Sequence, residues 1–229
     1  MSTSEDFAKS STTVKIGETY YSVDLGKVPY LESYLRFQGN AGQCTTHGDV
    51  PLFAVAYAGL ENGYRQYFRK LPDQLDQYHT LCETLDILCI DVLQQQTVKE
   101  VFEDLREGKG SYECEHKRSI FVKGDKKKAR NAAFKLLYLI LCAEFESDEK
   151  DSQIVYNAVL FVVSHRGIFK YRIRKMVRAA YEERFHISTK QMASLNKWPV
   201  LEPGKNGQAS EDEATTESSS DFGDWNSDF

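Results

Sequence analysis

The chain has 229 residues, 41% of them apolar and 12% aromatic, which is enough for one large domain or two small ones. The first residues lack the basic start and the apolar middle of a signal peptide, and no run of 18 apolar residues occurs. Neither a signal peptide nor a membrane-spanning helix is therefore predicted. Five irregularly spaced cysteines indicate reduced thiols in a cytoplasmic or nuclear protein.

The net charge of −5 is concentrated at one end of the chain. Residues 209–229 contain seven acidic side chains and no basic one, so without them the rest would carry about +2. Residues 1–12 are rich in serine and threonine, and residues 199–229 are rich in glycine, serine, threonine and acid. We therefore expect both segments to be disordered, the second as an acidic tail.

The first elements are predicted to be a hairpin and a helix. Two short alternating runs around Gly17 favour a β-hairpin. Pro29 suits the first turn of a helix that follows it. The polar residues 38–49 predict a loop, and the apolar residues 50–59 predict a buried strand that runs into a helix start.

Helices are predicted from there to residue 93. Residues 60–68 have helical spacing, and Leu71-Pro72 marks a break. In "LCETLDILCIDVL", residues 81–93, an apolar stripe with the helical period ends in a short apolar hook that breaks the period. The order predicted for residues 13–93 is therefore β-β-α-β-α-α.

The composition changes after residue 96. A polar stretch with one short amphipathic helix is followed by the basic cluster "KGDKKKAR" at 123–130. Three apolar segments, 129–145, 154–164 and 170–185, predict helices, and the first is apolar almost all round, which indicates burial among other helices. An all-helical region over residues 96–198 is expected.

The N-terminal half resembles the BTB/POZ domain. In that family a closing helix packs across the others and its apolar tail plugs the end of the core. "YRQYFRKLP" occupies the place of the family's "FxxxLxYLYTGxLP", whereas Asp24 stands where histidine is common. The positions that match the family's closing "LxxLAxxLxIxxL" are Leu81, Leu85, Leu88, Ile90 and Leu93, and those that resemble its entry helix are Val23, Leu25, Val28, Ser33 and Tyr34.

The resemblance implies an α+β protein with a BTB/POZ-like domain at 13–95 and a helical extension at 96–198, like one seen in fungal proteins. It also implies a non-catalytic protein–protein interaction module that forms homo-oligomers or recruits a cullin scaffold of a ubiquitin ligase, while the adjoining region binds a client. We expect no cofactor and no membrane contact, and nucleic acid is not the favoured partner.

The surface expected to mediate self-association is the first helix. BTB-like sheets and first helices commonly form a subunit contact, and Tyr30, Tyr34 and Phe37 are aromatic residues of the kind enriched at such contacts. The alternative is that these rings pack beneath the helices of residues 154–185 within one chain.

A second hypothesis is a transcription-associated protein that binds DNA. Lys170, Arg174 and Arg178 lie at i, i+4 and i+8, a helix face that could follow phosphates. The alternative is a solvated helix face. The lysines at 123–130 could also serve as a nuclear localisation signal, and the aromatic acidic tail "DFGDWNSDF" as a docking motif.

Enzyme and metal chemistry are not favoured. Cys44-x-x-His47 and Cys114-x-His116 lack the paired spacing of structural zinc sites. The nearest cysteine–histidine pair, His79 and Cys82, lies on one helix without an orienting third group.

Overall fold

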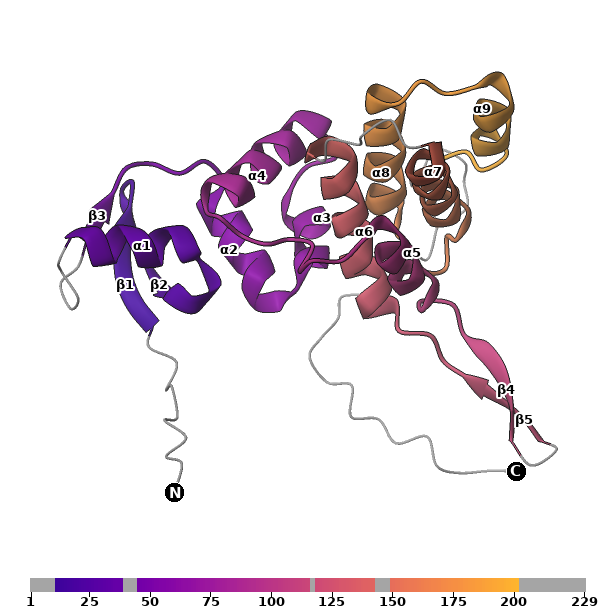
Figure 1. Cartoon of the computed structure of the whole chain (residues 1–229), viewed down its shortest axis with the longest axis horizontal. Coiled ribbons are helices and arrows are strands. Elements are labelled where there is room, and N and C mark those ends of the chain that lie inside the picture. The colour runs from indigo at the N-terminus through magenta and orange to yellow at the C-terminus, as the bar shows by residue number, and fades with distance from the viewer. Residues whose placement is uncertain (1–10, 39–44, 116–117, 143–148, 202–229) are drawn as a thin grey trace.

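The computed structural model describes residues 11–38, 45–115, 118–142 and 149–201. The molecule is elongated, with a small sheet at one end, a helical half at the other, and a hairpin that projects from the helical half (Figure 1). The structure is mostly helical with a few short strands, a mixture that is compatible with the predicted α+β class.

A three-stranded sheet forms the N-terminal lobe. Strand β1 (Ser11–Ile16) pairs antiparallel with β2 (Thr19–Asp24), and the turn between them uses Gly17 at φ +57°, which suits glycine. Strand β3 (Thr45–His47) pairs parallel with β1, so the order is β2-β1-β3. Helix α1 (Pro29–Gln38) connects β2 to β3 after a short 3₁₀ turn.

The middle of the molecule consists of helices α2 (Phe53–Asn62), α3 (Tyr67–Lys70) and α4 (Leu75–Ile87). Gly63, at φ +89°, separates α2 from a 3₁₀ turn that leads into α3. The predicted burial of Leu85 and Leu88 is confirmed, since both side chains are fully buried.

The apolar hook after α4 is a Schellman motif. The N–H of Cys89 donates to Asp86 O, and the N–H of Ile90 donates to Leu85 O. Cys89 adopts the left-handed conformation, φ 55°, that this motif requires. The turn brings Ile90 and Val92 back onto the core, where both are buried.

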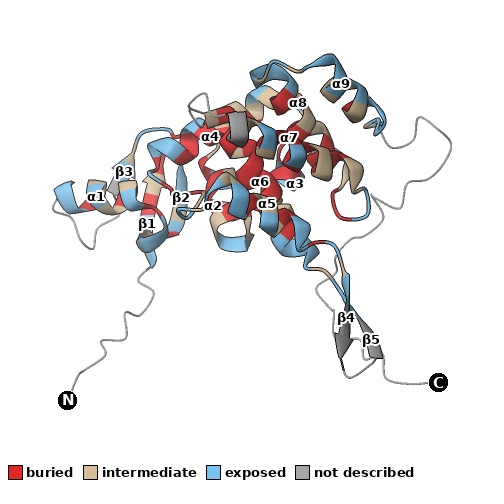
Figure 2. Cartoon of the chain, turned by 45° about the vertical axis from the view of Figure 1, so that its right-hand side comes forward, coloured by how far each residue is buried: buried red, intermediate tan, exposed pale blue. Residues whose placement is uncertain are grey.

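The second half is built around helix α6. Its side chains are buried along most of the helix, and the burial continues into the neighbouring elements (Figure 2). Phe134 of α6 packs edge-on against Tyr67 of α3, with ring centroids 4.4 Å apart. One continuous core therefore joins the two halves. The elements of this half are α5 (Val98–Arg106), β4 (Ser111–Glu115), β5 (Arg118–Val122), α6 (Lys126–Cys142), α7 (Glu149–Ser164), α8 (Tyr171–Arg184) and α9 (Thr189–Asn196).

The expected all-helical region is wrong for residues 111–115 and 118–122, which form the antiparallel strands β4 and β5. Its exposed Tyr112 and Phe121 face each other across the strands, with ring centroids 5.1 Å apart. Because the hairpin projects from the body, no burial periodicity marks it in the sequence (Figure 1).

Two further expectations need correction in the N-terminal lobe. The strand predicted within residues 50–59 is wrong, because α2 begins at Phe53, and the third strand lies at 45–47 instead. The first strand begins at Ser11, inside the segment expected to be disordered. The acidic tail lies outside the described residues from 202 onward.

Candidate functional site

The candidate site is the aromatic face of α1, which lies against β3. The rings of Tyr30 and Tyr34 pack edge-on against the His47 ring, with centroids 5.5 and 4.8 Å away. The Tyr34 hydroxyl donates to Thr46 O at 3.2 Å. These contacts hold the helix on the outer strand of the sheet.

His47 orders this face through both ring nitrogens. Its Nδ1 lies 2.9 Å from Gly48 O, and because a carbonyl oxygen only accepts, Nδ1 carries the proton. In the neutral ring Nε2 is then an acceptor, 2.9 Å from the Tyr30 hydroxyl that donates to it. The tyrosine is therefore fixed at its polar tip as well as along its ring.

Phe37 continues the aromatic face beyond the sheet. It follows Tyr30 by seven residues and Tyr34 by three, so all three lie on one side of the helix. Its side chain is 91% exposed, whereas the two tyrosines are half-buried. Burying a phenylalanine side chain gains about 1.5–3 kcal/mol, so this end of α1 can stabilise a contact with a partner.

The structure thus places the three predicted interaction residues on one helix face. The alternative that they pack beneath the helices of residues 154–185 is wrong, because Tyr30 and Tyr34 contact β3 and α1 lies at the opposite end of the molecule from α7 and α8 (Figure 1). The sequence suggested His47 only as part of a disfavoured zinc pattern, and its place on this aromatic face was missed because the polar composition of residues 38–49 predicts a loop.

The predicted DNA-binding face is not assembled. Arg174 is 4% exposed, and its Nε donates to Phe169 O within the core. Arg178 forms an ion pair with Glu182 at 2.7 Å and also donates to Asn196 Oδ1 at the end of α9. Only Lys170, which precedes α8, lies outside these contacts with its side chain half-buried. The i, i+4, i+8 spacing fails here because Arg174 falls on the buried stripe of the helix.

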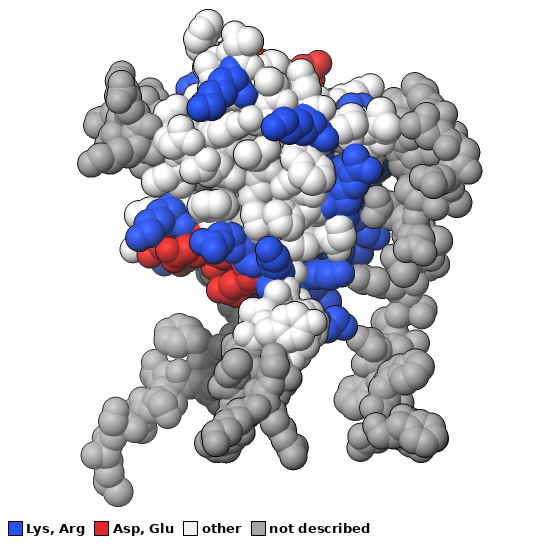
Figure 3. All heavy atoms as spheres, turned by 90° about the vertical axis from the view of Figure 1, so that its right-hand side faces the viewer, with Lys and Arg blue, Asp and Glu red and all other residues white. Residues whose placement is uncertain are grey.

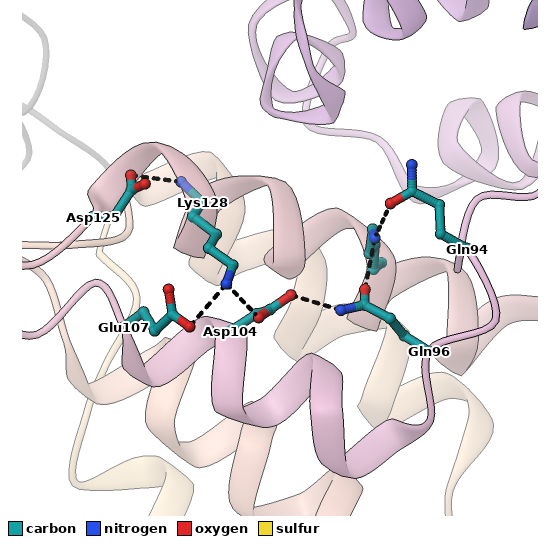
Figure 4. A network of polar contacts seen from close by, with 7 residues as sticks. Gln94, Gln96, Asp104, Glu107, Asp125 and Lys128 are labelled. Carbon is teal, nitrogen blue, oxygen red and sulfur yellow. Dashed lines mark hydrogen bonds and ion pairs between the residues drawn. The ribbon is translucent and has the colours of Figure 1, made fainter. Parts of the chain in front are cut away.

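A polar network occupies the junction between the two halves (Figure 4). Lys135 of α6 is 8% exposed, and its Nζ donates to Gln94 Oε1 at 3.0 Å and to Gln96 Oε1 at 2.6 Å. Gln96 in turn donates to Asp104, which also pairs with Lys128 at 3.0 Å. These residues line a pocket of about 650 Å³.

The network supplies hydrogen-bond acceptors to a largely buried cation. Burial lowers the pKa of Lys135 below that of an ordinary lysine, against the opposing effect of Asp104 and Asp91. The amine is held by amide oxygens, and Gln94 itself has a positive φ of 56°. This geometry fixes the loop after α4 onto α6. The one sequence signal for it was a lysine inside the apolar run at 132–145.

His79 and Cys82 differ in their surroundings. His79 bonds Glu183 of α8 at 2.8 Å, and Cys82 is fully buried. Across residues 11–38, 45–115, 118–142 and 149–201, no group of three or more potential ligands is placed to hold a metal ion. Cys44 lies outside the described residues, as does His116.

Comparisons with known proteins add no relative. No family model, no curated protein and no solved structure matches this chain. In the described part of the chain, no helix has both the length and the apolar character needed to cross a membrane.

Proposed function

We propose that this protein is a non-catalytic protein–protein interaction module that self-associates through α1 of its N-terminal lobe. The resemblance of residues 13–95 to the BTB/POZ domain supports this function. So does the order of elements in that lobe, in which a hairpin, a helix, a third strand and further helices end in an apolar hook. A cullin scaffold is the further class of partner that the same resemblance suggests.

The observation that carries the proposal is Phe37. A large apolar ring that is 91% exposed ends an aromatic face whose other members are held by β3. Such a ring, next to half-buried tyrosines, has the composition of a contact hot spot.

A second copy of this chain suits this surface on two grounds. The charges beside Phe37 are already paired, since Arg36 bonds Glu32 within the helix at 2.8 Å, so two copies would not repel each other there. The lobe also lies at one end of an elongated molecule (Figure 1). Two copies that meet by a two-fold axis at α1 would leave both helical halves free for a client.

The test is the mass of the purified protein in solution, measured by light scattering over a tenfold dilution series at micromolar concentration. We expect the wild type to form at least dimers and Phe37→Glu to shift toward the mass of one chain, because a buried carboxylate at the contact would be unpaired. Tyr20→Glu is the matched control. Tyr20 is 62% exposed in the same lobe but lies on β2, at the opposite edge of the sheet from β3.

A wild-type protein with the mass of one chain at every dilution would refute the proposal. If wild type and Phe37→Glu have equal masses that exceed the mass of one chain, the contact lies elsewhere on the protein. Far-ultraviolet circular dichroism of both variants checks that the fold is kept. The DNA-binding alternative is not carried further, because Arg174 is buried and Arg178 is bound to α9 and its own helix.

A further inference from the structure

A second pocket lies in the helical half, away from α1. It has a volume of about 240 Å³ and is formed where α3, the first turns of α6 and the start of α8 meet. Its lining residues are Arg65, Phe68, Arg69, Arg130, Lys170, Tyr171, Arg172 and Ile173.

The lining of this pocket is strongly basic. Five of its eight residues are arginine or lysine, and no acidic residue is among the described residues that line it. Basic side chains are also spread over the end face of the helical half, while acidic ones gather in a smaller area of that face (Figure 3). Basic side chains that gather in one hollow raise the local concentration of anions.

Several of these groups are held in place by bonds to neutral atoms. The Nε of Arg130 donates to Ile168 O at 2.8 Å, and Nη1 of Arg172 donates to Leu71 O at 3.4 Å. The backbone N–H of Arg65 donates to the side-chain oxygen of Asn131 at 2.9 Å. The first two bonds orient the guanidinium groups of α6 and of the start of α8, and the third fixes the backbone of the turn that carries Arg65.

The rest of the lining favours a phosphate over other anions. Guanidinium groups match the oxygens of phosphate with paired hydrogen bonds. The pocket also includes the first residues of α8, a 14-residue helix whose N-terminal dipole adds positive potential. Phe68 and Tyr171 supply ring surface beside the cations.

We propose that this pocket binds a compact polyphosphate group, either inorganic or carried by a nucleotide. Arg65, Lys170 and Arg172 in the lining suit an anion with several negative charges. The volume is below the roughly 300–1,000 Å³ of sites that enclose a drug-sized ligand, so the phosphate chain rather than a whole nucleotide would be enclosed. This site goes beyond the interaction function and does not depend on it.

Isothermal titration calorimetry of the full chain with inorganic tripolyphosphate and with ATP, at low and at physiological salt, tests the proposal. We expect saturable binding to the wild type that weakens with salt. The double variant Arg65→Gln, Arg172→Gln should bind about tenfold or more weakly. The control Lys190→Gln, Lys197→Gln removes two exposed charges from α9 and its C-cap and should bind like the wild type.

The two probes also separate the two sources of the phosphate. Equal affinity for both indicates that only the phosphate chain is recognised. Tighter binding of ATP that Tyr171→Leu reduces to the level of tripolyphosphate indicates a nucleotide.

Two results would overturn the proposal. One is no saturable binding of either probe by the wild type at about 1 mM, where even a weak site would be detected. The other is equal weakening in the double variant and in the control, which would reveal attraction to net charge alone. Thermal melting of the double variant without ligand checks that it folds, and Arg172→Glu, at an exposed position, provides an independent second variant.

Discussion

Cys89 occupies a backbone conformation that costs most side chains free energy. Its φ of 55° lies in the left-handed region, where a Cβ atom crowds the following carbonyl and costs roughly 1–2 kcal/mol. The Schellman bonds to Asp86 and Leu85, and the burial of Ile90 that they allow, offset this cost. The Cys89 side chain itself is exposed.

We therefore expect Cys89→Gly to stabilise the protein by about 0.5–1 kcal/mol, since glycine adopts this conformation without strain and no buried contact is lost. Urea denaturation followed by circular dichroism measures the change. Cys89→Ala is the control, because alanine keeps the Cβ atom and should not stabilise. An equal gain in both variants would show that removal of the sulfur atom, and not relief of backbone strain, causes the stabilisation.

At the scale of elements, one ion pair links α8 to the segment before α4. Lys175 Nζ lies 2.6 Å from Asp73 Oδ2, and both side chains are about a third exposed. The hydrogen bond from Lys175 lowers the pKa of Asp73 below its ordinary value. The folded state therefore holds the ionised carboxylate more strongly than the unfolded chain does.

This shift predicts a pH-dependent stability. The contribution of Asp73 is complete above its unfolded pKa of about 3.9 and is lost as the pH falls through the lower folded value. We expect Asp73→Asn to cost about 0.5 kcal/mol at pH 7, a small value because solvent screens the pair. The difference from wild type should shrink as the pH falls below the unfolded pKa of about 3.9 and vanish below the lower folded value. Glu83→Gln, at an exposed position on α4, should show no such dependence, and a cost for Asp73→Asn that persists at pH 2 would contradict the assignment.

Helices were the elements that the sequence predicted best. Segments 129–145, 154–164 and 170–185 correspond to α6, α7 and α8, because their buried faces repeat with the helical period. Strand β3 could not be predicted in the same way. It has only three residues, and its pairing with β1 depends on a partner about 30 residues earlier in the chain.

The candidate site was predicted only in part, for the same reason. Tyr30, Tyr34 and Phe37 were expected from the resemblance to BTB first helices and from their aromatic character, but their different exposure depends on how far β3 extends along α1. The basic pocket was not predicted, because Arg65, Arg130 and Arg172 come from segments that only the tertiary fold brings together. Lys170 was predicted to lie on a DNA-binding face, which the structure does not form. It lines this pocket instead.

At the scale of the whole molecule, the ordered chain continues past α9. Arg166 donates to Pro199 O at 3.2 Å, and Val200 packs against the core. We expect truncation after Leu201 to leave the melting temperature unchanged, because the removed residues are mostly polar and acidic. Truncation after Trp198 removes both contacts and should lower melting by about 2–4 °C. Differential scanning calorimetry compares the two, and equal melting temperatures would show that Val200 contributes nothing.

The shared core has a consequence for how the chain is made on the ribosome. Arg65, in the turn before α3, precedes its partner Asn131 by 66 positions, and Tyr67 must likewise wait for Phe134 of α6. At a synthesis rate of about 5–20 residues per second, the apolar side of α3 is left uncovered for roughly 3–13 s. Once the N-terminal lobe has left the ribosome, chaperones can therefore bind the nascent chain during those seconds. The interval ends when α6 emerges and covers α3.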